Sequence, residues 1–221
     1  MYSVDLSKIK IKDFAKLLKS IDLLPGRRIL LNGLDEIILL FEKNNCVNLA
    51  DIQKLLKNKN NYEELSKNFK TSEDYLVVLN REVNSYINKP IKLEEIAVIS
   101  KKIVNQLNQS GIKTTKDIYE ICIIQKNRKS IIEETGITSV ELNEIISLSD
   151  LLRINGVGPA YAMILFNIGI KSVKDYFKTE SIEILEKFQN ENKGNKYTKA
   201  NLGIKDVEYC KRFCMYLDQE I

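Results

Sequence analysis

The sequence predicts an all-α protein assembled from tandem repeats of short helices. Three observations support this prediction. Apolar residues recur at spacings of three and four, which is the spacing of an amphipathic helix. Period-two alternation between turn residues, the pattern of a half-buried strand, is scarce. Finally, a short phrase that begins with glycine and isoleucine returns at intervals along the chain.

Apolar stripes mark the expected helices in order. Residues 1–20 form a leader whose second half should pack as a helix through Phe14, Leu17 and Leu18. Three later stripes contain Leu30, Leu34, Ile37, Ile38 and Phe41, then Ile96, Ile99, Ile103, Val104 and Leu107, then Leu142, Ile145, Ile146 and 148–152. Residues 190–196 are polar and include a glycine, so we expect a solvated loop there.

The repeated phrase predicts where helices end and begin. It starts at Gly111, Gly136, Gly169 and Gly203, with asparagine in the glycine position at Asn45 and Asn68. These two residue types best tolerate the left-handed backbone that ends many helices. A polar residue then follows that can cap the next helix, with an acid three positions later. The expected caps are Asn48, Thr71, Thr114, Thr138 and Ser172, and the acids are Asp51, Asp74, Asp117, Glu141 and Asp175.

The phrases divide the chain into three units of short helices. Unit A lies near 21–90, unit B spans 91–146 and unit C spans 147–221. Asn88-Lys89-Pro90 is the clearest break in the pattern, because proline restricts the residue before it to extended backbone. We therefore expect an N-terminal module, 1–90, that holds the leader and unit A, and a C-terminal module, 91–221, that holds units B and C.

Composition excludes several classes of enzyme. The 221 residues include no histidine, so there is no Ser–His or Cys–His nucleophile pair and no histidine-ligated zinc or haem. The 34 Lys and Arg residues exceed the 30 Asp and Glu residues by only four, and 28 of the 34 are lysine. A surplus this small gives weak support for a nucleic-acid partner.

The cysteines and the apolar runs point to a cytoplasmic protein without a metal. Four cysteines in a chain of this length do not form a disulfide framework, and we expect them to be buried and reduced. Cys210 and Cys214 share a helix face but lack further ligands. We also expect no cofactor and no catalytic residues. The apolar runs are too short to span a bilayer, and no signal peptide is recognisable at the start.

One hairpin in unit C has the chemistry to hold a phosphate. The segment 151–165 reads as a helix, a tight Gly156-Val157-Gly158 turn and a second helix that starts at Pro159. Glycines allow a sharp turn and close approach of a ligand, and the free amides at a helix start attract anions. A hairpin that serves only to join two helices is the equally weighted alternative.

This segment resembles a helix-hairpin-helix motif, which many DNA repair and replication proteins use to hold a nucleic-acid backbone. The resemblance implies a fold of tandem helix-hairpin-helix-like repeats. It also implies a phosphate site made by Gly156, Val157, Gly158 and Ala160, with Arg153, Lys171 and Lys174 as nearby cations. The sequence departs from the motif directly after the second glycine, where DNA-binding examples often carry Lys, Arg or Thr and this chain has Pro159, Ala160 and Tyr161.

The whole chain is also similar to an uncharacterised bacterial family, a domain of unknown function with helix-hairpin-helix repeats. The segments that carry this similarity include 2–6, 23–30, 75–85, 127–129 and 148–154. The similarity implies a fold and nucleic-acid binding, without an established activity.

Two hypotheses for function follow. The first is a non-enzymatic protein that binds nucleic acid, DNA in the first instance, through backbone phosphates and with little dependence on sequence. The second is a helical-repeat scaffold for protein partners. Basic side chains gathered around the Gly156–Gly158 turn would favour the first hypothesis, whereas mixed charge with an apolar surface there would favour the second. A carboxylate hydrolase that uses a divalent metal is a weaker third hypothesis.

Overall fold

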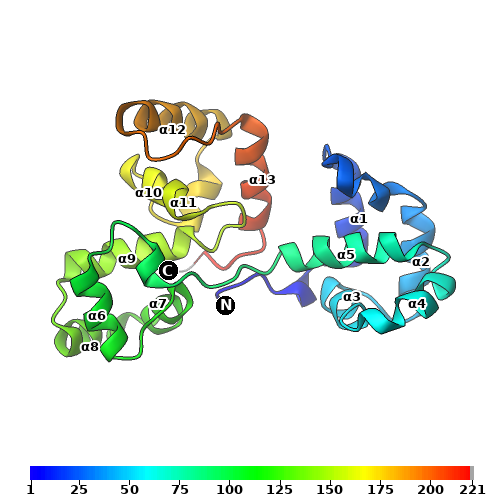
Figure 1. Cartoon of the computed structure of the whole chain (residues 1–221), viewed down its shortest axis with the longest axis horizontal. Helices are drawn as coiled ribbons and strands as arrows, with labels where there is room; N and C mark the ends of the chain where they lie inside the picture. The colour runs from blue at the N-terminus through cyan, green and yellow to red at the C-terminus, as the bar shows by residue number, and fades with distance from the viewer. Residues whose placement is uncertain (220–221) are drawn as a thin grey trace. The chain divides into compact units, whose positions relative to one another are not determined.

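The prediction of an all-α protein is confirmed. Figure 1 shows the computed structural model, which describes residues 1–219, so the last two residues of the predicted module 91–221 lie outside the described residues. Over the described range the chain forms 13 α-helices and four short 3₁₀ helices. No strand occurs within this range, although two isolated bridges join Lys10 to Asn48 and Lys92 to Thr114.

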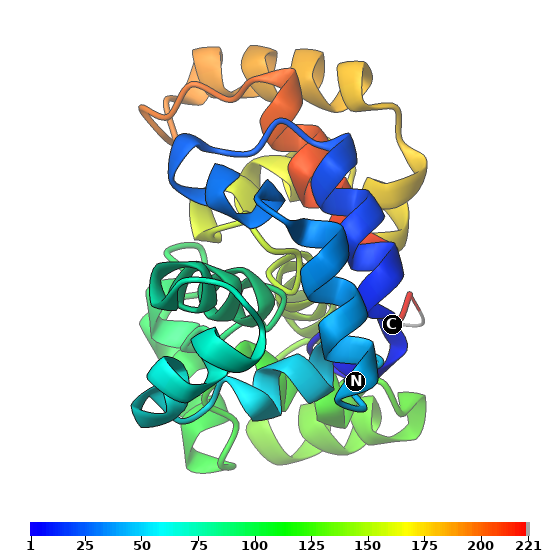
Figure 2. The same ribbon diagram turned by 90° about the vertical axis from the view of Figure 1, so that its right-hand side faces the viewer.

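The chain divides into two compact units, and the first contains Asp5–Ile87. Its elements are η1 (Leu6–Lys8), α1 (Ile11–Ser20), η2 (Pro25–Leu31), α2 (Leu34–Lys43), α3 (Leu49–Leu55), η3 (Lys59–Asn61), α4 (Tyr62–Asn68) and α5 (Glu73–Ser85). Helices α1 and α2 lie side by side, as Figure 2 shows, and α5 packs against η2, α3 and α4. The predicted helix in the leader is α1, and it buries Phe14 and Leu18 and half-buries Leu17.

The second compact unit contains Met1–Val4 and the chain from Asn88 onward. Its elements are η4 (Leu93–Glu95), α6 (Lys101–Gln109), α7 (Thr115–Cys122), α8 (Gln125–Thr135), α9 (Ser139–Leu151), α10 (Pro159–Asn167), α11 (Val173–Lys178), α12 (Ser181–Asn195) and α13 (Ile204–Cys214). Helix α9 packs against α7 and α10, while α12 lies against α10 and α13 (Figure 1).

Residues 1–4 thus belong with the C-terminal helices, although the sequence suggested a leader that joins unit A. Tyr2 is the physical reason. Its ring is buried edge-on against Tyr119 of α7, and its hydroxyl lies 2.6 Å from the Thr115 hydroxyl. A buried aromatic residue with a satisfied hydroxyl is a strong anchor for a chain terminus.

Most of the predicted caps are confirmed. Asn48, Thr114 and Thr138 form capping boxes with the acids three residues later, and Ser172 caps α11 through the amide of Asp175. Four of the predicted helix-ending residues have positive φ, namely Asn45, Gly111, Gly136 and Gly169. The local rules for helix ends therefore hold at these turns. The arrangement of the units as tandem repeats stays a prediction.

The predicted helix ends are wrong at two of the repeated phrases, those that begin at Asn68 and Gly203. Asn68 remains helical, because Phe69 continues the backbone pattern and packs its ring on Phe41 with 4.4 Å between centroids. Lys70 then takes the positive φ, and Ser72 rather than Thr71 caps α5. Gly203 ends no helix; its φ is −113° and it begins α13, with its N–H donated to the Asp206 carboxylate at 2.8 Å.

The predicted loop at 190–196 is also wrong, because α12 continues to Asn195 and Lys196 ends it in the left-handed conformation. Polar side chains stabilise this last part of the helix. The Glu191 carboxylate accepts hydrogen bonds from Asn195 and from the Tyr197 hydroxyl, and Asn192 exchanges bonds with the Thr198 backbone. These polar side chains form hydrogen bonds within the protein as well as with solvent. Composition alone does not reveal such internal hydrogen bonds.

The four cysteines are buried and free, as predicted. Burial raises the pKa of the Cys210 and Cys214 thiols to about 12, so both stay protonated at neutral pH and neither is a ready nucleophile or metal ligand. Within residues 1–219, no helix has both the length and the apolar character needed to cross a membrane.

Candidate functional site

The hairpin predicted in unit C is present and joins α9 to α10. Its turn, 152–158, begins at the C-cap of α9, and the Val157 N–H closes it by donating to the Ile154 carbonyl at 3.0 Å. Val157 is buried between the helices, while Gly158 is the N-cap of α10 and Pro159 its first residue. The local sequence therefore folds as its residue types predict.

The two glycines of the turn have different roles. Gly156 has φ +92°, and a side chain there would place its Cβ 2.8 Å from Cys210 Sγ on α13. Gly158 has φ −92°, a conformation open to any residue, and a Cβ there would meet no atom within 4 Å. Gly156 thus serves the packing of α13 on the turn, and only Gly158 has open space for a ligand.

This difference predicts that alanine destabilises the protein at Gly156 far more than at Gly158. We expect Gly156→Ala to lower the free energy of unfolding by about 2 kcal/mol or more, because it adds left-handed strain to a steric overlap with Cys210. Gly158→Ala should change it by less than about 0.5 kcal/mol. Urea denaturation monitored by circular dichroism measures both, and equal stability of the two variants would contradict the assignment.

The start of α10 leaves three backbone N–H groups unused. Among the described residues, no protein acceptor takes the N–H of Gly158, Ala160 or Tyr161, whereas that of Val157 is already bonded within the turn. These groups lie at the positive end of the helix dipole. They are therefore free to donate to an anion or to a carbonyl oxygen of a partner.

A surface groove, which we name the α10 groove, opens beside these N–H groups. It has a volume of about 450 Å³. Besides Gly158 and Ala160, its lining includes the apolar residues Pro159, Phe188 and Leu202 and the acid Asp206. Among the described residues, its lining contains no lysine or arginine. The carboxylate of Asp206 accepts the Gly203 N–H at 2.8 Å.

Arg153 is not available to a ligand at this turn. Its side chain is buried, with a residue exposure of 1%. The guanidinium forms an ion pair with Asp150, donates to the backbone carbonyls of Tyr2, Met1 and Asp218, and stacks 4.0 Å above the centre of the Tyr119 ring. Its predicted role as a cationic helper is therefore wrong, and its observed role is to fix the chain ends to α9.

Asp150 is the counterpart of Arg153 inside the same buried cluster. Its second carboxylate oxygen accepts the Val173 N–H at 2.8 Å, at the start of α11. Burial raises the pKa of the Asp150 carboxyl, and the adjacent Arg153 acts in the opposite direction. An opposite-charge pair at i, i+3 inside the apolar run 148–154 is the sequence signal that could have indicated a buried pair.

The structure does not bring Lys171 or Lys174 to the turn. The Lys171 ammonium lies 5.2 Å from the ring centre of Phe166, near the C-terminal end of α10. A helix of nine residues is roughly 13 Å long, so Lys171 is near the end opposite Gly158. Lys174 is exposed on α11 and lies two residues before Tyr176, the residue that contacts Tyr161. It therefore projects from a different face of α11.

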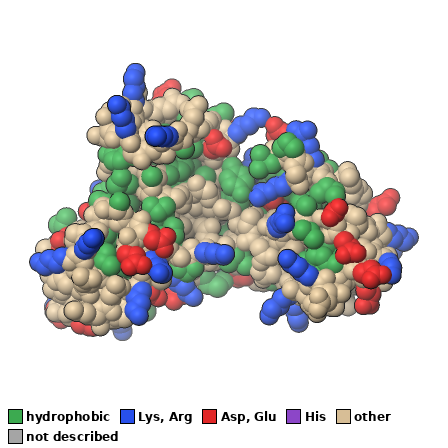
Figure 3. All heavy atoms as spheres, in the orientation of Figure 1, with side chains coloured by type: hydrophobic (Ala, Val, Ile, Leu, Met, Phe, Trp, Pro, Cys, Tyr) green, Lys and Arg blue, Asp and Glu red, His purple; other side chains and the backbone are tan. Residues whose placement is uncertain are grey.

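The predicted cations Arg153 and Lys171 do not gather at the hairpin turn. On the face of the molecule shown in Figure 3, Lys and Arg side chains are interspersed with Asp and Glu. The residues predicted to act together thus separate into two groups. Gly156, Gly158 and Ala160 line the α10 groove beside the buried Val157, whereas Arg153, Lys171 and Lys174 lie elsewhere.

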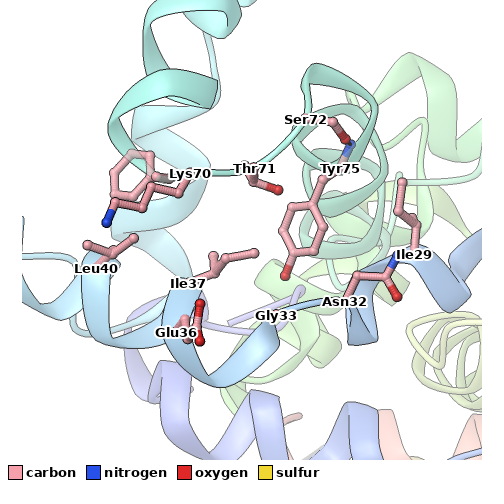
Figure 4. Close-up of a pocket in the computed structure, with 11 residues that line it drawn as sticks. Ile29, Asn32, Gly33, Glu36, Ile37, Leu40, Lys70, Thr71, Ser72 and Tyr75 are labelled. Carbon is pink, nitrogen blue, oxygen red and sulfur yellow. Dashed lines mark hydrogen bonds between the residues drawn. The ribbon is translucent and has the colours of Figure 1, made fainter.

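A second pocket, in the unit Asp5–Ile87, has no catalytic arrangement. It measures about 500 Å³ and lies between the starts of α2 and α5 (Figure 4). The Tyr75 hydroxyl points toward Gly33, and the Lys70 ammonium lies beside Leu40. Across residues 1–219, no three Cys, Asp or Glu side chains are grouped so as to hold a metal ion.

The described chain is all-α, and the start of α10 presents three unused N–H groups beside a groove. Residues 97–213, which run from just before α6 almost to the end of α13, match the model of a domain of unknown function, DUF4332. The chain belongs to this family. Neither a curated protein nor a solved structure matches it.

Proposed function

We propose that the protein binds nucleic acid, without catalysing a reaction, by donating the N–H groups of Gly158, Ala160 and Tyr161 to a backbone phosphate. The observation that carries this proposal is the set of three N–H groups at the start of α10 that no described residue accepts. A phosphate oxygen at the positive end of a helix is a common pairing. Gly158 has no side chain to obstruct its approach.

In this proposal the hairpin is a helix-hairpin-helix, and units A, B and C are its tandem relatives in a bacterial, cytoplasmic protein. Backbone amides that bind phosphates do not contact the bases, so affinity should depend little on nucleotide sequence. The phosphate contact is made by Gly158, Ala160 and Tyr161. Gly156 and Val157 shape the turn, and Arg153 supports it from the interior.

The scarcity of cations at the groove predicts a weak salt dependence. Each phosphate neutralised on duplex DNA contributes about −0.9 to the slope of log affinity against log salt. With no lysine or arginine in the α10 groove, we expect a slope shallower than about −3. Fluorescence anisotropy with single-stranded, duplex and branched oligonucleotides at several salt concentrations measures this slope. A slope near −8 would point to a broad basic surface and contradict the proposal.

A second candidate function, docking of a protein segment, is favoured by one specific observation. Pro159, Phe188 and Leu202 give the α10 groove an apolar wall next to the free N–H groups. Such a groove can accept an apolar side chain while the amides take a backbone carbonyl or a carboxylate. The same anisotropy experiment separates the two functions, because the absence of binding to every oligonucleotide would favour the protein partner.

A further inference from the structure

A groove between α3 and α5 is lined, among the described residues, by two lysines and by no acid. This α3–α5 groove has a volume of about 520 Å³ and is lined by Gln53, Lys54, Lys57, Asn80 and Asn84. Every one of these side chains can donate a hydrogen bond, and none carries a negative charge. A concave surface lined in this way concentrates anions more than scattered lysines do.

The two lysines of the groove are exposed and form no ion pair within the described residues. Elsewhere in the same unit, ammonium groups lie beside carboxylates, as at Lys12–Glu42, Lys16–Asp13, Lys19–Asp35 and Lys67–Glu63. Lys57 follows Lys54 by one turn, and its N–H donates to the Lys54 carbonyl. Like charges one turn apart repel each other, so the unpaired arrangement costs stability unless an anion lies between them.

The acidic residues of α3 and α5 either form other interactions or lie in a different turn of the helix from the groove residues. The Asp51 carboxylate accepts the backbone N–H groups of Val47 and Asn48 in a capping box. Glu73 and Asp74 lie in the first turn of α5, more than one turn before Asn80. Glu82 is buried and forms an ion pair with Arg27. Within the described residues, no carboxylate of either helix forms an ion pair with Lys54 or Lys57.

Side-chain amides hold the floor of the groove in place. Gln53 Nε2 donates to Asn84 Oδ1 at 2.9 Å across the two helices, and Asn84 Nδ2 donates to the Asn80 carbonyl at 2.7 Å. This chain of hydrogen bonds fixes the spacing between α3 and α5. The two lysines can then approach one ligand with little rearrangement of the backbone.

We propose that the α3–α5 groove binds a phosphate group of a nucleic-acid backbone through Lys54, Lys57 and Gln53. The inference rests on the proposed function, since it supplies the cationic contact that the α10 groove lacks. The chemistry that recognises the ligand is a phosphate with several acceptor oxygens. A free phosphate or a mononucleotide presents the same oxygens, so the experiment includes both sources.

The test uses the full chain and two double variants that change net charge equally. Lys54→Gln with Lys57→Gln removes the groove cations, while Lys16→Gln with Lys19→Gln removes two lysines that are paired with acids on the same unit. Fluorescence anisotropy with a labelled duplex at low salt should show five- to tenfold weaker binding for the groove variant. The salt slope should become shallower by about 0.9, as expected for one lost phosphate contact. The control should differ from the wild type by less than twofold.

Three results would overturn the inference. The first is equal affinity of the groove variant and the control for the duplex. The second is a groove variant that loses binding to inorganic phosphate or AMP, measured by thermal shift, but not to the duplex. The groove would then bind a free phosphate and not a nucleic-acid backbone. The third is a wild type that binds no probe. If the groove variant keeps its duplex affinity while Gly158→Glu loses it, the inference fails and the proposed function stands. If Gly158→Glu keeps its duplex affinity while the groove variant loses it, the proposed contact at the start of α10 fails and the α3–α5 groove is the phosphate contact.

Discussion

Replacing Arg153 by Met should destabilise the protein by about 3–5 kcal/mol, the cost typical of leaving one buried charge without its partner. The substitution removes the guanidinium from Asp150, which remains buried, and removes the hydrogen bonds that Arg153 donates to the carbonyls of Tyr2 and Asp218. It also removes the stacking contact with Tyr119.

Urea denaturation monitored by circular dichroism measures the loss of unfolding free energy. Two further variants identify its cause. Arg212→Met changes an arginine on α13 for which no ion pair is observed in the described structure, and should cost less than about 0.5 kcal/mol. The double variant Asp150→Asn with Arg153→Met should lose less than Arg153→Met alone, because no unpaired charge is left. If Arg153→Met were as stable as Arg212→Met, Arg153 would not be the buried anchor of the chain ends.

Replacing Gly158 by Glu should weaken nucleic-acid binding at least tenfold, equivalent to about 1.4 kcal/mol of binding free energy. The new carboxylate would lie beside the N–H groups of Ala160 and Tyr161, where it would take the place of the phosphate and repel others. Because Gly158 has an ordinary φ and open space around it, the variant should fold normally.

Gly158→Ala is the matched control for this substitution, since it adds a side chain at the same position without a charge. We expect its affinity to stay within twofold of the wild type. Anisotropy with a labelled duplex gives both affinities, and a thermal melt checks that each variant is folded. Wild-type affinity in Gly158→Glu would show that the start of α10 does not contact the nucleic acid.

Helix ends could be predicted from the sequence because their causes are local. Thr114 caps α7 and Thr138 caps α9 through residues three positions away, so a short segment contains all the necessary information. The same reasoning placed the α9–α10 turn correctly. It was wrong at Asn68, where the packing of Phe69 on Phe41 extends the helix, because that contact joins two distant helices.

The candidate site was harder to predict, because its details depend on distant contacts. Arg153 is drawn into the interior by Tyr2, Tyr119 and Asp218, none of which is near it in the sequence. Gly156 and Gly158 look equivalent in the sequence, yet α13 packs on only the first of them. The sequence did not indicate Lys54 and Lys57, because the groove that they line forms only when α3 packs against α5.

The amide signals of the protein give the most direct test of the central claim. In a ¹H–¹⁵N correlation spectrum, addition of a short duplex should move the signals of Gly158, Ala160 and Tyr161 most within the unit that contains α10. Inorganic sulfate at the same ionic strength should move them less. Unchanged signals at these three residues, while the duplex binds elsewhere or does not bind, would contradict the proposal that the start of α10 holds a backbone phosphate.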